Sequence, residues 1–384
     1  MPVGLDHQSF SEVGRSYGGG RIYFPELDIL RFVAFLMVYL VHVVNDNLKV
    51  NPFLRAVGSN GGFGVPVFFA LSAFLITMLL LREREVSKSV HLGSFYIRRV
   101  LRIWPIYFLS LFFCFFISHL YASHLSSYIH TGLKVCSLKE LASYLLFYGN
   151  WYSYLHGTLP GGANVLWSIC VEEQFYLVWP LIVKLGGKSA IVVVSIACWL
   201  ISQFYLHWFF LSGSAGRYRV DFSTLANLQY FAIGGLLGVM FYNRKVCLPA
   251  WARVLLVAGG LIAFFGFNTS AASHNTVGCY MTAGLGTALL LVGMFGMRVH
   301  RTFNPLRYLG KISYGLYVYH FWLLLFVEYA VRDLILRVEP ELSVIVAVLT
   351  LPLTIVVAHF SYKWFESPFL RLKERFEVVR SRPV

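Results

Sequence analysis

The sequence predicts an all-α integral membrane protein, a polytopic bundle of about ten transmembrane helices with both termini in the cytoplasm. Two observations lead to this prediction. Only 13% of the 384 residues are charged and 58% are hydrophobic, whereas a soluble protein carries about 25% charged residues. The apolar residues also form runs of about 17 to 22 residues, the length that a hydrocarbon core of about 30 Å requires.

Ten runs of this kind cover most of the chain. They lie at 27–45, 62–81, 103–121, 165–183, 190–211, 223–242, 252–268, 277–297, 312–330 and 343–362. Glu172 and Glu173 interrupt the fourth run, and 141–151 is an additional interfacial or re-entrant candidate. We expect a cytoplasmic segment at 1–26, a transmembrane domain at 27–366 and a basic cytoplasmic tail at 367–384.

Lysine and arginine predict the orientation. With a cytoplasmic amino terminus, the inside segments hold 23 basic residues and the outside loops hold 8, and Arg31 within the first run completes the 32. Cytoplasmic loops of membrane proteins carry such an excess of positive charge. The net charge of +14 therefore indicates topology, with a lipid bilayer and no nucleic acid as partner. The six cysteines form no CxxC or Cys/His pattern, so no metal site is expected.

The first run, LDILRFVAFLMVYLVHVVN, carries three ionisable residues, Asp28, Arg31 and His42. At 100° and about 1.5 Å per residue, Arg31 and His42 share one helix face about 16 Å apart. Asp28 lies one turn before Arg31 and can pair with it. A charged group facing lipid is costly, at least about 2.5 kcal/mol at the bilayer centre, so this face should line a protein interior or a wet cavity.

Six motifs in order along the chain carry a family resemblance. They are LDILRFVAFLMVYLVH from residue 27, GVPVFFALSAFLI with Ser72, FYIRRVLRIWPIY with the Arg99-to-Arg102 step, LWSICVEEQFYLVWPL with Trp167, LGKISYGLYVYH with Tyr314 and His320, and FESP at 365–368. Together they resemble the acyltransferase 3 family, integral membrane enzymes that O-acylate bacterial glycans and some small molecules. The resemblance covers essentially the whole chain and implies a location in the bacterial inner membrane.

Moving an acyl group from a thioester to an alcohol requires a base for the hydroxyl proton and donors for the developing oxyanion. His42 is our predicted base, because the pKa of histidine lies near neutrality, and the resemblance implies the same role. The alternative is a core histidine bonded to a neighbouring helix. Arg31 either assists the thioester carbonyl or the phosphates of the carrier, or it neutralises Asp28.

The carrier implied by the resemblance is acyl-CoA, and its phosphates need cationic partners. Arg98, Arg99 and Arg102 lie at the cytoplasmic end of the third predicted span, where guanidinium groups suit phosphates. Their alternative role is ordinary anchoring of the topology.

Glu172 and Glu173 point about 100° apart on a helix. One of them is therefore expected to face the site, where it orients a base or contacts the acceptor. The remaining structural or acceptor-site candidates are Asp28, Ser72, Trp167, Tyr314 and His320.

The predicted function is transfer of an acyl group, expected to be acetyl, from acetyl-CoA or another acyl-CoA to a hydroxyl of a glycan such as an O-antigen, an exopolysaccharide or a lipid-linked sugar. One alternative acceptor is a hydrophobic small molecule such as a macrolide or lipid. A second alternative is a proton-coupled transporter, against which stands the lack of paired halves with interrupted helices. We expect a wet channel along the Arg31–His42 face past Ala34 and Val38, and we expect Leu36 and Leu40 to face lipid. The acceptor is expected from the outside connection 122–164.

Overall fold

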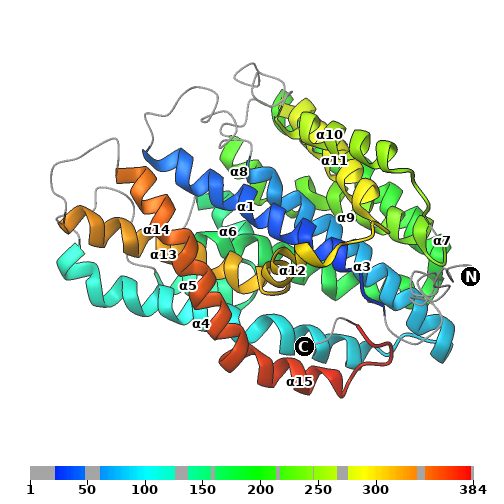
Figure 1. Ribbon diagram of the computed structural model, residues 1–384, viewed down its shortest axis with the longest axis horizontal. Coiled ribbons are helices and arrows are strands. Elements are labelled where there is room, and N and C mark those ends of the chain that lie inside the picture. The colour runs from blue at the N-terminus through cyan, green and yellow to red at the C-terminus, as the bar shows by residue number, and fades with distance from the viewer. Residues whose placement is uncertain are drawn as a thin grey trace, which may run out of the picture.

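The computed structural model describes residues 22–47, 61–125, 137–156, 161–212, 217–244, 246–265, 276–334 and 342–381, and the regular secondary structure in these ranges is helical. The α-helices are α1 (Pro25–Asn47), α3 (Gly64–Ser87), α4 (Leu92–Leu125), α5 (Leu138–Leu145), α6 (Gly149–His156), α7 (Trp167–Leu211), α8 (Arg217–Phe222), α9 (Thr224–Phe241), α10 (Ala250–Phe265), α11 (Thr276–Met294), α12 (Asn304–Lys311), α13 (Ser313–Leu334), α14 (Leu342–Phe360) and α15 (Ser367–Glu374). Short helical turns precede α3 (η2, Gly61–Phe63), α7 (η3, Gly161–Leu166) and α12 (η4, Arg301–Phe303), and a π-helix (η5, Ser361–Glu366) joins α14 to α15. Figure 1 shows an elongated bundle in which most of the long helices run in one general direction.

Each predicted span overlaps a helix, two of them the same helix, and the predicted all-α class is confirmed for the described residues. Within those residues, six helices are long and apolar enough to cross a membrane, at Gly64–Ser87, Leu92–Phe116, Trp167–Leu211, Thr224–Phe241, Val277–Met294 and Ile345–Glu374. The count of ten and the cytoplasmic orientation stay predictions. The segment 141–151 contributes to two short helices, α5 and α6, and α6 packs against α7 and α8.

The fourth and fifth predicted spans form one continuous helix, α7, which bends at Gly187. The backbone there has φ 59° and ψ −140°, a conformation that glycine adopts without the steric cost of a Cβ atom. A Cβ atom at this position would also lie 2.1 Å from Nη1 of Arg84, which donates a hydrogen bond to the Val183 carbonyl at 2.9 Å. The bend at Gly187 divides the 45 residues of α7 into two helical segments, which correspond to the two predicted spans.

Helices α1 and α3 touch along the face where the sequence predicted a wet channel. A Cβ atom on Gly64 of α3 would lie 2.3 Å from the Ala34 carbonyl oxygen and 2.9 Å from the Val38 side chain. Ala34 and Val38 are accordingly buried, at 0% and 2% exposure. The expected channel past these two residues is therefore wrong, because the absence of a side chain on Gly64 lets the α3 backbone close over them. Of the two residues expected to face lipid, Leu40 is exposed, whereas Leu36 is half-buried and packs against the core.

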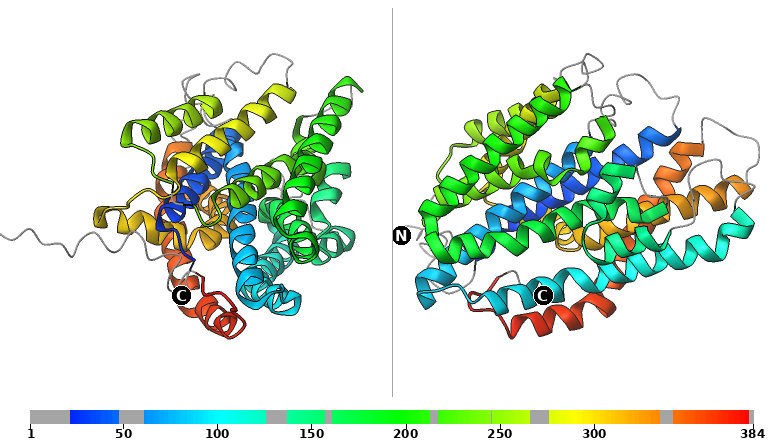
Figure 2. Two further views of the ribbon diagram at one scale, coloured as in Figure 1. Left: turned by 90° about the vertical axis from the view of Figure 1, so that its right-hand side faces the viewer. Right: turned by 180° about the vertical axis from the view of Figure 1, so that it is seen from behind.

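The two ends of the described chain meet. The Ile22 N–H donates to the Arg380 carbonyl at 2.8 Å, and α15 packs along α4, as Figure 2 shows from behind. Arg98 of α4 donates to the Phe376 carbonyl at 2.7 Å and fixes the segment that follows α15. Both ends of the described chain therefore lie at the same end of the bundle, next to the arginines of α4.

Candidate active site

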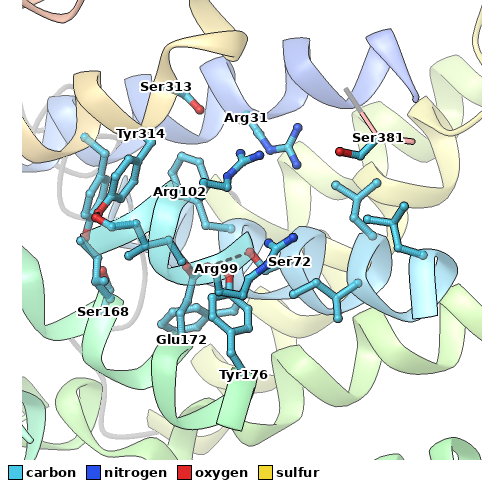
Figure 3. Close-up of a pocket in the computed structure, with 18 of the residues that line it drawn as sticks. Arg31, Ser72, Arg99, Arg102, Ser168, Glu172, Tyr176, Ser313, Tyr314 and Ser381 are labelled. Atoms are coloured by element: carbon cyan, nitrogen blue, oxygen red, sulfur yellow. Dashed lines mark hydrogen bonds between the residues drawn. The ribbon is translucent and has the colours of Figure 1, made fainter. Parts of the chain in front are cut away.

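A cavity of about 140 Å³ lies between α1, α3, α4, α7 and α13. Six of the twelve predicted site residues line it: Arg31, Ser72, Arg99, Arg102, Glu172 and Tyr314. Figure 3 shows Arg31 and Arg102 on one side and Glu172 with Tyr176 on the other. Residues from five helices, separated by up to 283 positions between Arg31 and Tyr314, thus meet at one place.

Three guanidinium groups supply the positive charge of the cavity. Arg99 and Arg102 face it together because residues three apart share a helix face. The Arg99 guanidinium lies 5.5 Å from the centre of the Phe95 ring and 5.7 Å from that of Tyr176, so its charge is within cation–π range of both rings. Its Nε atom is buried and finds no hydrogen-bond partner among the described residues. Arg99 therefore lines the cavity with one buried donor that the described residues leave unsatisfied.

Arg31 enters the cavity from α1 and is held at its base by Asp28. Its Nη1 atom lies 2.6 Å from Oδ1 of Asp28, and the Tyr23 hydroxyl donates to Oδ2 at 2.9 Å. Asp28 is fully buried, so Arg31 compensates a carboxylate charge that would be costly to bury without a partner. The predicted pairing of these two residues is confirmed, and Arg31 is directed into the cavity as well.

The adjacent glutamates separate as the helix geometry predicted. Glu172 lines the cavity, and its two carboxylate oxygens accept from the Ser72 hydroxyl at 2.8 Å and the Tyr176 hydroxyl at 3.0 Å. Glu173 is outside this lining and accepts from Nε1 of Trp104 at 3.3 Å. The other oxygen of Glu173 is buried without a hydrogen-bond partner in the described part of the chain. Glu172 is thus the carboxylate that can act on a ligand in the cavity.

The two predicted histidines contact each other one helical turn beyond the cavity. Nε2 of His320 lies 3.2 Å from Nδ1 of His42. His42 is not among the lining residues, but Tyr317, three residues before His320 on α13, is. The Tyr317 hydroxyl hydrogen-bonds to the Ser168 hydroxyl at 2.7 Å. The predicted base is therefore not part of the cavity lining, but it contacts a histidine that lies one turn along α13 from a lining residue.

Two predicted residues have structural partners. Arg98 is excluded from the larger cavity and forms a buried ion pair with Glu83, with 3.0 Å between Nη2 and Oε2. Trp167 begins α7 and packs edge-to-face on Phe69 and Phe222, with ring centres 6.2 and 5.2 Å apart. These contacts account for the burial of both side chains, and the prediction that Arg98 binds acyl-CoA has no support in this geometry.

The sequence prediction missed Tyr176, Tyr317 and Ser168, which also line the cavity. A signal for the two tyrosines was present. Tyr176 lies four residues after Glu172 and Tyr317 three before His320, and such spacings place side chains on one helix face. Within the described residues, no group of three His, Cys, Asp or Glu side chains is arranged to hold a metal ion.

Comparisons with known proteins identify the family of this chain. A family model described as an acyltransferase domain matches residues 24–360. The peptidoglycan O-acetyltransferase of Listeria monocytogenes is 26% identical over 378 residues, covering 91% of this chain and 56% of that protein. An O-acetyltransferase of Staphylococcus aureus is 25% identical over 394 residues, covering 95% of this chain and 60% of that protein. The chain thus spans little more than half the length of these curated relatives, and no solved structure matches it. Because the family model covers most of the sequence, the chain belongs to the acyltransferase 3 family.

Proposed function

We propose that this chain is a membrane O-acyltransferase that moves an acyl group, acetyl in the first instance, from acyl-CoA to a hydroxyl of a glycan. The observation that carries the proposal is the cavity, which gathers three guanidinium groups and a carboxylate that two hydroxyls hold in place. The family model supports the reaction class. Guanidinium groups form charge-assisted, often bidentate hydrogen bonds to phosphate, and coenzyme A carries phosphates at its nucleotide end.

In this proposal the phosphates bind near Arg31, Arg99 and Arg102, and the pantetheine arm extends between α3 and α13. The arm brings the thioester toward Tyr317, one turn from His320. Glu172 balances the positive charge and keeps Ser72 and Tyr176 on the wall. The route replaces the channel past Ala34 and Val38, which the close contact of α1 with α3 blocks.

The chemical step assigns the base to His42. Its free ring nitrogen takes the proton of the acceptor hydroxyl while that oxygen bonds to the thioester carbonyl carbon. The carbon–sulfur bond then breaks, the electron pair leaves on the coenzyme A sulfur, and the proton passes from His42 to that thiolate. The products are an ester and the free thiol, so no further reactant is needed.

The acceptor is proposed from the relatives. The Listeria protein is named for peptidoglycan, and a glycan reached from the outer face of the inner membrane fits the predicted orientation. The outside connection 122–164 is the proposed entry, although 126–136 and 157–160 lie outside the described residues. A hydrophobic small-molecule acceptor would use the same donor site.

The test is acetyl transfer by purified protein in lipid vesicles. Thiol release from acetyl-CoA should depend on added glycan, and mass spectrometry of surface glycans should show ester-linked acetyl only in cells that contain the protein. His42→Ala should abolish both signals while the protein still accumulates in the membrane. His300→Ala is the matched control, because that imidazole bonds to Thr302 within an exposed turn. Normal transfer by His42→Ala would refute the assignment of the base, and no thiol release with any hydroxyl acceptor would refute the function.

A further inference from the structure

The contact between His320 and His42 determines which nitrogen of His42 can act as a base. His320 lies on α13 and is fully buried. Its Nδ1 atom lies 2.6 Å from the Tyr317 carbonyl oxygen, and its Nε2 atom lies 3.2 Å from Nδ1 of His42. The same Nδ1 atom of His42 lies 3.0 Å from the Val38 carbonyl oxygen. Both imidazoles therefore have a backbone carbonyl beside Nδ1.

These partners assign the protons. A carbonyl oxygen only accepts hydrogen bonds, so each Nδ1 atom carries its hydrogen, and a neutral imidazole has only one N–H. Nε2 of His320 is then an acceptor, and the hydrogen that faces it comes from Nδ1 of His42. The hydrogen on Nδ1 of His42 is shared between His320 and the Val38 carbonyl. Nε2 of His42 is left with its lone pair, and in the described part of the chain no hydrogen bond reaches it.

We propose that His320 is a positioning residue for acyl transfer, which holds the His42 ring with Nε2 toward the acceptor hydroxyl and strengthens its hydrogen bond when His42 takes up the proton. The proposal rests on the proposed function. His320 itself gains and loses no proton. The hydroxyl proton moves to Nε2 of His42 and then to the coenzyme A thiolate, while His320 accepts from the charged imidazolium in between.

The energetic argument concerns the transition state. A hydrogen bond from an ionised donor is about twice as strong as a neutral one, and His42 is ionised only after it takes the proton. An interaction that strengthens only at that stage raises kcat and leaves substrate binding unchanged. His320 should therefore affect kcat and not the KM for acetyl-CoA.

The surroundings fix the pair in this orientation. Phe35 and Tyr39 of α1 contact the His320 ring, with ring centres 5.7 and 6.2 Å apart. Phe321 contacts the His42 ring edge-to-face at 4.9 Å. Aromatic packing on both rings restricts their rotation, so the direction of the hydrogen bond between them is set by the fold.

Three substitutions of His320 distinguish a role as hydrogen-bond acceptor for His42 from a role in packing alone. In His320→Asn the amide can still donate to the Tyr317 carbonyl but does not reach His42. In His320→Gln the side-chain oxygen reaches the place of Nε2 and can accept from His42. In His320→Phe the ring fills the space with no acceptor. We expect kcat to fall about 5- to 10-fold in the Asn and Phe variants, which is the difference between a hydrogen bond to a charged group and one to a neutral group, and to recover substantially in the Gln variant.

The measurements are kcat and the KM for acetyl-CoA of purified variants in vesicles, with size-exclusion profiles as the folding check. The expected result is an unchanged KM with kcat in the order wild type, Gln, then Asn and Phe. Wild-type kcat in the Asn or Phe variant would overturn the proposal, as would equal loss in all three folded variants. If Phe does not accumulate, the comparison of Asn with Gln decides. If wild-type protein shows no transfer, the proposed function fails first. An active wild type with an inactive His42→Ala and a normal His320→Asn would overturn the positioning role alone.

Discussion

Removing the Arg99 guanidinium is expected to weaken coenzyme A binding by about 10- to 150-fold. Arg99 lines the cavity and keeps a buried Nε without a hydrogen-bond partner among the described residues. Hydrogen bonds to charged groups contribute about 1.5 to 3 kcal/mol each, and 1.4 kcal/mol corresponds to a tenfold change in Kd. The loss of one such bond to phosphate in Arg99→Ala gives the stated range, and the loss of a bidentate pair would exceed it.

Lysine at this position should recover only part of the affinity. It keeps the charge but loses the planar fork that binds phosphate in a bidentate way, and it changes the cation–π contacts with Phe95 and Tyr176. The assay is equilibrium binding of radiolabelled coenzyme A to purified protein in detergent, at fixed ionic strength. Arg82→Ala is the matched control, because Arg82 forms a partly exposed pair with Glu85 at 2.9 Å, and such pairs contribute about 0 to 1 kcal/mol.

The binding series distinguishes a phosphate site from general positive charge. An unchanged Kd for coenzyme A in both Arg99→Ala and Arg102→Ala would refute the donor site. The arginines would then only fix the membrane topology. An equal loss of affinity in Arg82→Ala would show that surface charge, and not the cavity, attracts the carrier. Only a loss confined to the cavity arginines agrees with the proposal.

Three further predictions follow. Glu172→Gln turns an amide N–H₂ toward a hydroxyl donor and should lower transfer at saturating acetyl-CoA at least about tenfold, whereas Glu173→Gln should retain most of it; equal rates in the two variants would contradict the separation of the pair. Glu83→Ala leaves the buried Arg98 guanidinium without its charged partner, an expected cost of about 3 to 5 kcal/mol, and should lower the melting temperature in detergent. Gly310→Ala would place a Cβ atom 1.8 Å from an α1 backbone carbonyl oxygen and should reduce accumulation of the protein in the membrane. Gly93→Ala is the control, because a Cβ atom there has nothing within 4 Å, and it should accumulate normally. Immunoblots of membrane fractions measure both.

Much of the site could be predicted from the sequence, because a charged side chain in an apolar helix must face the protein interior or a wet cavity rather than lipid. Arg31 and Glu172 had to face the protein interior, and the spacing of Arg99 and Arg102 put both on one helix face. The structure brings these four residues to one cavity. A period of 3.6 residues is enough for such predictions, since they concern a single helix.

Predictions that involved a second helix were less secure. Ala34 and Val38 share the face of Arg31, yet Gly64 of α3 closes over them, and only a glycine on another helix decides that. Arg98 is adjacent to Arg99 but is rotated about 100° from it and meets Glu83, a residue 15 positions earlier at the end of α3. The sequence pattern within one helix does not predict which other helix packs against each of its faces.

The contacts that define the site join helices that are distant along the chain. Ser72 and Glu172 are 100 positions apart, and His42 and His320 are 278 apart. In a membrane interior each polar group needs a partner, because no water replaces a missing hydrogen bond. Polar residues in separate spans are therefore driven to meet, and their pairing fixes how the helices assemble. Among the described residues, Nε2 of His42 and Nε of Arg99 have no hydrogen-bond partner, and under the proposed function the side chains that carry them meet the acceptor hydroxyl and the carrier phosphate.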